Sequence, residues 1–317
     1  MTTDFQTPLN HLLDQHRIQA GSLIISVFGD AVRPRGGRIW LGSLITLLEP
    51  FQINERLVRT AIFRLAKEGW LRTETLGRRA DYLLTPAGQS RFEEASRHIY
   101  AAHTPLWDRR WRLILTMGNL TTKQRNNLRS ALFWQGFGAI GNDCFVHPST
   151  DLTTAFDTLM ADGMSDLLKH LMPMLAADAG FSLSASDADM VRRAWDLEQL
   201  GAAYEDFTQS YHPMIDLLRQ GASSNMSDQQ AFLLRTLLIH DYRRLLLRDP
   251  ELPDALLPPH WPGQQARALC QELYRRLLAP SERHLDAVMR LADSSTPPVL
   301  PMLHERFQGK DPLQLNL

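Results

Sequence analysis

The sequence predicts an α+β protein in three parts, and three observations lead to this prediction. Near the N-terminus, two helical patterns precede a pair of strand-like runs. In the middle, strand-like and helical patterns alternate, and the last third holds long helical patterns. We expect domains at residues 1–103, 104–182 and 183–317, the last one all helical. The chain has 317 residues and 44% apolar composition, which is enough to bury a core in each part.

The helical pattern that begins after Asn54 has two faces of opposite chemistry. Apolar residues recur on one face at three- and four-residue spacing, and mostly polar or basic residues occupy the other. Asn54 is a suitable N-cap, and Gly69 follows the last periodic residue. The apolar face consists of Val58, Ala61, Ile62 and Leu65, and the other face of Arg56, Arg59, Thr60, Phe63 and Lys67. We interpret this segment as a recognition helix for DNA.

The segments around this helix make the interpretation more specific. The apolar run from Trp40 to Leu48 predicts a short helix that Pro50 ends, so only a tight turn separates the two helices. Two strand-like runs, 70–75 and 79–85, flank Leu76-Gly77-Arg78, where Gly77 can adopt the positive φ of a hairpin turn. Thr85 and Pro86 then start another helix that reaches about residue 102. This order is that of a winged helix-turn-helix domain.

The distribution of charge agrees with a DNA-binding N-terminal part. The whole chain is nearly neutral, with 34 Lys and Arg against 35 Asp and Glu. From Arg33 to Arg79, however, ten basic residues stand against four acidic ones, a net charge of +6, so the rest must carry −7 to reach the total of −1. A basic domain attached to an otherwise acidic chain is typical of a DNA-binding protein with a separate regulatory domain. The alternative is a solvated helix face beside a surface hairpin.

The predicted DNA contacts follow from positions on these elements. We expect Arg56, Arg59 and Thr60 near the helix start to contact base edges, and Arg64 and Lys67 to contact phosphate. Arg78 and Arg79 at the hairpin tip would contact the backbone or the minor groove. The predicted DNA-binding residues are Ser43, Asn54, Arg56, Arg59, Thr60, Phe63, Arg64, Lys67, Arg78 and Arg79.

Cysteine content and the N-terminus indicate the compartment. Cys144 and Cys270 are far apart and have no metal-ligand spacing, so we expect two reduced thiols. The N-terminus lacks the basic start and apolar run of a signal peptide, and no stretch reaches the roughly 18 apolar residues of a membrane helix. We expect a cytoplasmic protein without a membrane partner.

Four N-terminal motifs together resemble the PaaX family of phenylacetate-pathway transcriptional repressors. They are GSLIISVFGDAV, RGGRIWLGSL, ERLVRTAIFRLAKEGWL and GRRADYLLTPAG. A second block from Leu237 to Gly263, LLIHDYRRLLLRDPELPDALLPPHWPG, resembles the C-terminal signature of the family. One departure is Ala80-Asp81 beside the hairpin arginines, where a small and an aromatic residue are expected. The resemblance implies a repressor of the phenylacetate catabolic operon that phenylacetyl-CoA releases from its operator.

The middle segment has the pattern of a small α/β unit. Trp111 to Thr116 is a strand candidate, Lys123 to Trp134 a helix, Phe137 to His147 an extended run and Asp151 to Met160 a helix. The family resemblance implies a ferredoxin-like fold similar to the Cas2 nucleases, which makes a metal-dependent nuclease an alternative function. Such an enzyme needs carboxylates at a strand end, and residues 116–119 contain none. We expect no enzymatic activity, no catalytic residues and no cofactor.

Two further patterns in the middle segment are weak signals. Gly136, Gly138 and Gly141 spell G-x-G-x-x-G, but the run follows a helix and enters an extended segment, the reverse of a dinucleotide site. We interpret it as a turn. Cys144 and His147 have no further ligand partners nearby, so we expect no metal site.

The last third predicts two long helices with capping boxes. Ser186 with Asp189 opens a helix expected to end at Pro213, and Ser227 with Gln230 opens a largely buried one expected to reach Arg248. An acyl-CoA ligand offers an aromatic end and phosphates, so its site should combine aromatic side chains with Arg. The candidate effector-binding residues are His240, Tyr242, Arg243, Arg244 and Trp261. The alternative is that the arginines form ion pairs and Trp261 is a core residue.

The combined hypothesis is a homodimeric repressor of a palindromic double-stranded DNA operator, with phenylacetyl-CoA as effector. A two-fold pair of winged helices would place two recognition helices about 34 Å apart, one duplex turn. The alternatives are a Cas2-like metal-dependent nuclease fused to a winged helix, and a repressor of another aromatic-acid pathway with a different acyl-CoA.

Overall fold

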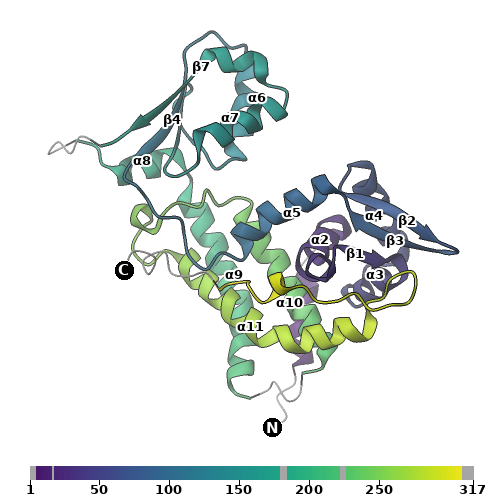
Figure 1. Ribbon diagram of the computed structural model, residues 1–317. Helices are drawn as coiled ribbons and strands as arrows, with labels where there is room; N and C mark the ends of the chain where they lie inside the picture. The colour runs from purple at the N-terminus through teal and green to yellow at the C-terminus, as the bar shows by residue number, and fades with distance from the viewer. Residues whose placement is uncertain (1–4, 16–17, 179–183, 222–225, 309–317) are drawn as a thin grey trace. The chain divides into compact units, whose positions relative to one another are not determined.

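The computed structural model describes residues 5–15, 18–178, 184–221 and 226–308 (Figure 1). It divides into two compact units, each built from separate stretches of chain. Of the described residues, the first unit comprises 5–15, 18–102, 205–221, 226–243 and 264–308, and the second comprises 103–178, 184–204 and 244–263. The division into three domains at residues 1–103, 104–182 and 183–317 stays a prediction.

The N-terminal part of the first unit has the predicted pair of helices and the hairpin. Asn54 caps α4, because its side-chain oxygen accepts the Leu57 backbone N–H at 3.0 Å. Pro50 lies in a 3-10 turn that joins α3 to α4. The elements in order are α1 Gln6–Gln15, α2 Ala20–Val27, the π-helix η1 Phe28–Val32, η2 Arg33–Arg35, β1 Arg38–Trp40, α3 Leu41–Leu48, η3 Glu49–Phe51, α4 Glu55–Lys67, β2 Leu71–Leu76, β3 Arg79–Leu84 and α5 Pro86–Ile99. The two helices and the two strands are thereby confirmed as elements.

A three-stranded antiparallel sheet of order β1-β3-β2 combines β1, which precedes α3, with the hairpin that follows α4. Leu76 pairs with Arg79, so Gly77 and Arg78 form the two-residue turn, and Gly77 has the positive φ of 58° that such a turn requires. Thr85 caps α5 by accepting the Gly88 N–H at 2.9 Å. The apolar face of α4 packs inward through Val58, Ile62 and Leu65, and the basic face stays exposed.

Two long helices and an extended segment complete the first unit. Helix α10 (Asp228–Leu246) begins with the predicted capping box of Ser227 and Gln230 and is buried without a break from Ala231 to Tyr242. Helix α11 (Pro262–Val288) is followed by a segment that runs along the N-terminal elements, which we call the C-terminal strap, residues 289–300. Within the strap, the Arg290 carbonyl accepts the Trp40 N–H at 3.1 Å. No local sequence pattern predicts this segment.

The second unit holds a four-stranded antiparallel sheet of order β5-β6-β4-β7. Alternate residues of β4 face its two sides. Ile114 packs into a core with Leu128 of α6 and Leu159 of α7, whereas Trp111 packs with Val191 of α8 on the other side. The elements are β4 Trp111–Thr116, α6 Thr122–Phe133, β5 Gly138–Ile140, β6 Cys144–His147, α7 Leu152–Ala161, η4 Ser165–His170, β7 Leu171–Ala176 and α8 Asp187–Ala194.

Two predictions about these elements were inaccurate. The extended run from Phe137 to His147 is two short strands, because Gly141 has a φ of 70° and turns the chain back. The G-x-G-x-x-G run is thus a turn, as expected. The helix opened by Ser186 ends after eight residues, because Trp195 is extended, and α9 (Leu197–Arg219) then continues past Pro213. A proline removes one backbone donor but can be accommodated within a helix packed on both sides of it.

No helix among the described residues is long and apolar enough to cross a membrane.

Candidate DNA-binding surface

The exposed face of α4 carries most of the predicted DNA-binding residues. Asn54, Arg56, Arg59, Thr60, Phe63, Arg64 and Lys67 are all exposed. They lie at three- and four-residue spacing and therefore share one side of the helix. The Phe63 ring is 73% exposed, more than any other large hydrophobic side chain of the described residues. An apolar ring among cations on a free helix face is a typical arrangement for a surface that enters a DNA groove.

Ion pairs within α4 fix two of these arginines. Arg59 contacts Glu55 at 2.6 Å, and Arg64 contacts Glu68 at 3.2 Å. Both pairs are exposed and span one helical turn, so each holds a guanidinium on the helix surface at little energetic cost. The side chains of Arg56 and Lys67 make no hydrogen bond or ion pair within the described part of the chain. The side chains of Arg56 and Lys67 are thus free to contact DNA. Arg59 and Arg64 must first release their glutamate partners before they can bind a phosphate or a base.

The arginines at the hairpin tip are in different states. Arg78 is exposed in the turn. Arg79 donates to the Ser294 hydroxyl at 2.6 Å, and its guanidinium lies 4.6 Å from the centre of the Trp40 ring. Asp81 is buried and accepts from Arg38 at 2.6 Å and from the Ala292 N–H at 2.7 Å. The carboxylate that departs from the family pattern therefore binds the C-terminal strap and does not face the hairpin's outer surface.

Ser43 is buried and hydrogen-bonded inside the first unit. Its side chain is only 3% exposed. Its hydroxyl donates to the Val288 carbonyl at 3.2 Å and accepts the Arg290 N–H at 2.9 Å. The serine therefore joins α3 to the end of α11 and the strap, and we leave it out of the surface proposed to contact DNA.

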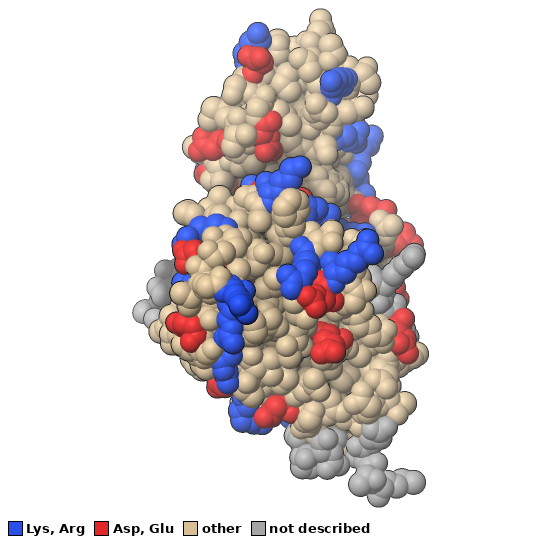
Figure 2. Space-filling view, turned by 90° about the vertical axis from the view of Figure 1, so that its right-hand side faces the viewer, with Lys and Arg blue, Asp and Glu red and all other residues tan. Residues whose placement is uncertain are grey.

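Part of the local excess of basic residues is neutralised inside the first unit. Arg35 is buried and contacts Glu282 at 2.6 Å and Asp286 at 2.8 Å. Arg38 contacts Asp81 at 2.6 Å and Glu74 at 3.1 Å. Figure 2 looks at the side toward which the hairpin points, and Lys and Arg side chains there are interspersed with acidic ones. The net charge of +6 counted along the sequence therefore overstates the charge available to DNA.

Family models match three successive segments of the chain. The PaaX-like protein model matches residues 19–88, the PaaX protein central Cas2-like domain matches 104–172, and the PaaX-like protein C-terminal domain matches 195–287. The chain is also 39% identical over 274 residues to the transcriptional repressor PaaX of Escherichia coli, covering 86% of this chain and 84% of the relative. The chain belongs to the PaaX family. It is a PaaX-like transcriptional repressor with a Cas2-like middle domain and a helical C-terminal region.

A solved structure supports the fold of this PaaX-family chain. The uncharacterized protein Rv0674 from Mycobacterium tuberculosis superimposes with a TM-score of 0.55 at 21% identity, covering 84% of this chain and 98% of the other. At that identity the similarity concerns the fold alone.

The candidate effector-binding residues do not form one group within a single unit. His240, Tyr242 and Arg243 belong to the first unit, and Arg244 and Trp261 to the second. The His240 ring and the Ser26 hydroxyl are 3.0 Å apart, and Arg243 donates to the Ser22 hydroxyl at 2.9 Å. Tyr242 and Trp261 are buried, against Phe207 and Tyr204 respectively. The burial of Trp261 favours the packing alternative, and the contacts of His240, Tyr242 and Arg243 hold these side chains against neighbours within the first unit.

The residues considered for metal binding have other roles. Cys144 and His147 lie at opposite ends of β6 and contribute to different faces of the sheet. The His147 Nδ1 accepts the backbone N–H groups of Ser149 and Thr150 at 3.0 and 2.8 Å. No group of three or more His, Cys, Asp or Glu side chains in the described ranges is placed to hold a metal ion.

Proposed function

We propose that this chain represses the phenylacetate catabolic operon by placing α4 in the major groove, as the recognition helix of a winged helix-turn-helix. The observation that carries the proposal is the exposed face of α4, where Arg56, Phe63 and Lys67 project together beside the β2–β3 hairpin. A major groove admits one α-helix, and Arg can bind guanine with two hydrogen bonds. The PaaX repressor of E. coli supports the choice of operon by its name.

The proposed effector is phenylacetyl-CoA, acting on a cytoplasmic homodimer. A ligand releases DNA only if it binds the DNA-free arrangement more tightly than the DNA-bound one. A two-fold dimer would match a palindromic operator, with no cofactor and no enzymatic step. The residues His240, Tyr242, Arg243, Arg244 and Trp261 stay the sequence-based hypothesis for the effector, although their packing disfavours it.

The proposal is tested by fluorescence anisotropy on DNA from the chain's own upstream region and from a neighbouring phenylacetate operon. Arg56→Ala should weaken operator binding and reduce discrimination against unrelated DNA, by about 1–3 kcal/mol. Arg78→Ala should weaken binding to all DNA and lower the slope of log K against log salt by about one. Arg129→Ala, which removes an exposed arginine from α6, is the matched control and should change neither quantity.

Equal affinity of the parent protein for operator and unrelated DNA would refute the operator-specific function. The same preparation is then incubated with DNA and Mg²⁺ or Mn²⁺. Metal-dependent cleavage that a chelator stops would support the Cas2-like nuclease alternative. Release of operator DNA by another acyl-CoA, but not by phenylacetyl-CoA, would support a repressor of a different aromatic-acid pathway.

A further inference from the structure

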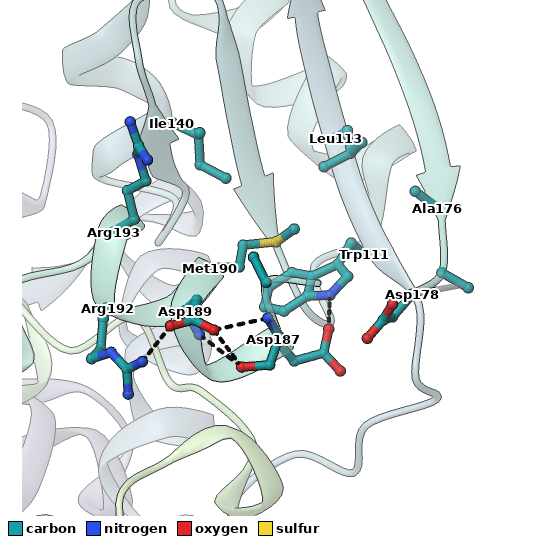
Figure 3. A pocket seen from close by; sticks show the side chains of 13 residues that line it. Trp111, Leu113, Ile140, Ala176, Asp178, Asp187, Asp189, Met190, Arg192 and Arg193 are labelled. Atoms are coloured by element: carbon teal, nitrogen blue, oxygen red, sulfur yellow. Dashed lines mark hydrogen bonds and ion pairs between the residues drawn. The ribbon is translucent and has the colours of Figure 1, made fainter. Parts of the chain in front are cut away.

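The second unit contains a pocket on the side of its sheet that α6 and α7 do not cover (Figure 3). Its volume is about 570 Å³. Leu113 of β4, Ile140 of β5 and Met190 of α8 form its half-buried apolar walls around Trp111. This volume lies within the range of small-molecule sites, which are mostly apolar and carry a few polar groups.

The aromatic wall of the pocket is held in place by its neighbours. The Trp111 indole N–H donates to Asp187 at 2.7 Å. Its ring stacks on Trp195, with centroids 6.3 Å apart and planes 26° apart, and meets Trp107 edge to face at 5.6 Å. A side chain fixed on several sides cannot turn to fill the adjoining space. The pocket is therefore preformed, which lowers the free-energy cost of binding a rigid ligand.

Most charged groups around the pocket already have protein partners. Asp189 accepts from the Ser186 N–H and hydroxyl and from Arg192. These hydrogen bonds, that of the Ser186 N–H first, lower the pKa of Asp189 to about 2, so it stays ionised. Asp187 accepts from Trp111. Arg193 is exposed and makes no hydrogen bond or ion pair within the part of the chain that the structure describes.

Figure 3 places Arg193 at the Ile140 end of the pocket, with Asp178 and Asp187 toward the Trp111 end. The apolar walls thus separate this unpaired cation from Asp178 and Asp187, while the nearer carboxylate, Asp189, is paired with Arg192. For the negative charge of a bound anion, the end of the pocket next to Arg193 is electrostatically favourable, and the end next to Asp178 and Asp187 is unfavourable. Inorganic anions are poorly matched to this pocket, because they have no apolar surface to bury against its apolar middle.

We propose that this pocket binds an organic anion, whose flat apolar group lies among Leu113, Ile140 and Met190 and whose negative charge pairs with Arg193. Aryl and arylalkyl carboxylates have this chemistry, because their negative charge lies close to the ring. In a CoA thioester the acyl end is neutral and the negative charge lies on the phosphates of the CoA part. The choice of phenylacetyl-CoA as a probe rests on the proposed function, whereas the pocket and the ligand class do not.

Chain connectivity gives such a ligand a route to influence the first unit. Trp195 stacks on Trp111 and lies two residues before the start of α9. Helix α9 is continuous from Leu197 to Arg219, and the unit boundary falls within it, between Tyr204 and Glu205. A ligand that packs against Trp111 or Met190 therefore acts near the start of a helix shared by both units, which gives the two units a continuous physical connection.

The experiment uses the full chain and three probes: phenylacetyl-CoA, phenylacetate and CoA. Direct binding is measured by isothermal titration calorimetry, and operator release by fluorescence anisotropy. The variants are Arg193→Glu, which reverses the charge, and Ala176→Phe, which fills the pocket from β7. Arg192→Glu is the matched control, because the neighbouring arginine is occupied by Asp189.

The aryl probe is whichever of phenylacetyl-CoA and phenylacetate binds the parent protein. Arg193→Glu and Ala176→Phe should each weaken its binding by about tenfold or more, the usual loss for a charged hydrogen bond or a filled site. Arg192→Glu should have a smaller effect, and operator affinity without ligand should stay unchanged in all three. Unchanged aryl-probe binding by both pocket variants would overturn the proposal. Failure of the parent to bind any probe would overturn it too, while specific operator binding in that preparation would leave the repressor function standing.

Discussion

At the scale of single residues, exposure distinguishes side chains that sequence position alone makes equivalent. Arg56 and Phe63 project freely from α4, whereas Ser43 is buried against α11 and Arg79 is held by Ser294. Reading the polar face of a helix predicts which residues can reach a partner. Only the surrounding segments determine which of them are already engaged.

Phe63 is expected to read thymine methyl groups in the operator. Its ring has no polar atom, and the C5-methyl of thymine is the apolar feature of the major groove. Replacing each operator thymine by deoxyuridine removes this methyl alone, and at a contacted position it should cost about 0.8 kcal/mol, threefold to fourfold in affinity. Anisotropy titrations with a set of singly substituted operators measure the effect.

In Phe63→Ala the same deoxyuridine substitution should have no effect, because the contact is already gone. Phe133→Ala removes another exposed phenylalanine, on α6, and should keep the sensitivity of the parent. If none of the deoxyuridine substitutions lowered the affinity of the parent protein, the predicted contact between Phe63 and thymine methyl groups would be ruled out, although DNA binding itself would not.

His147 should make the protein less stable on mild acidification. Burial lowers the pKa of His147 from 6.5 to about 4, so the folded protein resists a proton that the unfolded chain accepts near pH 6.5. Its contribution to the free energy of unfolding is fully present above pH 6.5 and is lost as the pH falls toward 4. By pH 5 the loss should be about 2 kcal/mol.

Urea unfolding at pH 7 and pH 5 tests this expectation. His147→Gln lacks the titrating group, so its stability should fall less over the same interval. Since other groups titrate in both proteins, the difference between the two pH dependences is the quantity to compare. Identical dependences would show that His147 does not control this transition.

At the scale of elements, a buried ion network connects the π-helix to α10 and α11. Arg235 of α10 contacts Asp30 at 2.8 Å and Glu282 at 2.5 Å. Arg306 contacts Asp30 at 2.7 Å. Burial alone would raise the pKa of Asp30, but the two arginines outweigh it and hold that pKa below its usual value. The network fixes the N-terminal elements on the C-terminal helices.

Arg235→Met should lower the free energy of unfolding by about 3 kcal/mol or more, because it removes one of the two arginines that contact each of the carboxylates Asp30 and Glu282. The control is Arg276→Met, which breaks an exposed ion pair with Glu272 and should cost under about 1 kcal/mol. Chemical unfolding followed by circular dichroism gives both values. Equal stability of the two variants would contradict the importance assigned to this network.

At the scale of the whole molecule, the two units are assembled from interleaved stretches of chain. Among the described residues, the first unit combines the N-terminal elements up to residue 102 with most of α9, α10 and α11. The strap further joins the end of α11 to α3 and the hairpin through Ser43, Asp81 and Arg79. The elements proposed to contact DNA and the C-terminal helices are thus parts of one compact unit, and the strap links the end of α11 to α3 and to the hairpin.

The proposed homodimer leads to a prediction about operator spacing. Two recognition helices related by a two-fold axis require half-sites on one side of the duplex. Inserting about 5 base pairs between the half-sites rotates one by half a turn and should reduce affinity by about tenfold or more, whereas about 10 base pairs should restore part of it. Anisotropy measures the affinities, and light scattering of the complex measures its stoichiometry. Equal affinity for all three spacings would argue for independent monomers.

The sequence by itself determined the local elements, because their signals lie within a few residues of one another. Asn54 and Thr85 cap the helices they were expected to cap, Gly77 makes the expected turn, and the spacing of Val58, Ile62 and Leu65 separates the buried face of α4 from its exposed one. The hairpin and the long buried α10 have the same basis. Family membership also follows from motifs that are contiguous in the chain.

Tertiary structure alone decided how distant segments use those residues. The break at Trp195 and the passage of α9 through Pro213 depend on packing that no local pattern records. Ser43, Arg35 and Asp81 bind partners that lie more than 200 residues away in the sequence. Their charges and polar groups are therefore not available to DNA, although a count along the sequence includes them. The pocket beside Trp111 likewise forms only where β4, β5 and α8 meet. Long-range burial and ion pairing, not local propensity, therefore select which side chains remain available for binding.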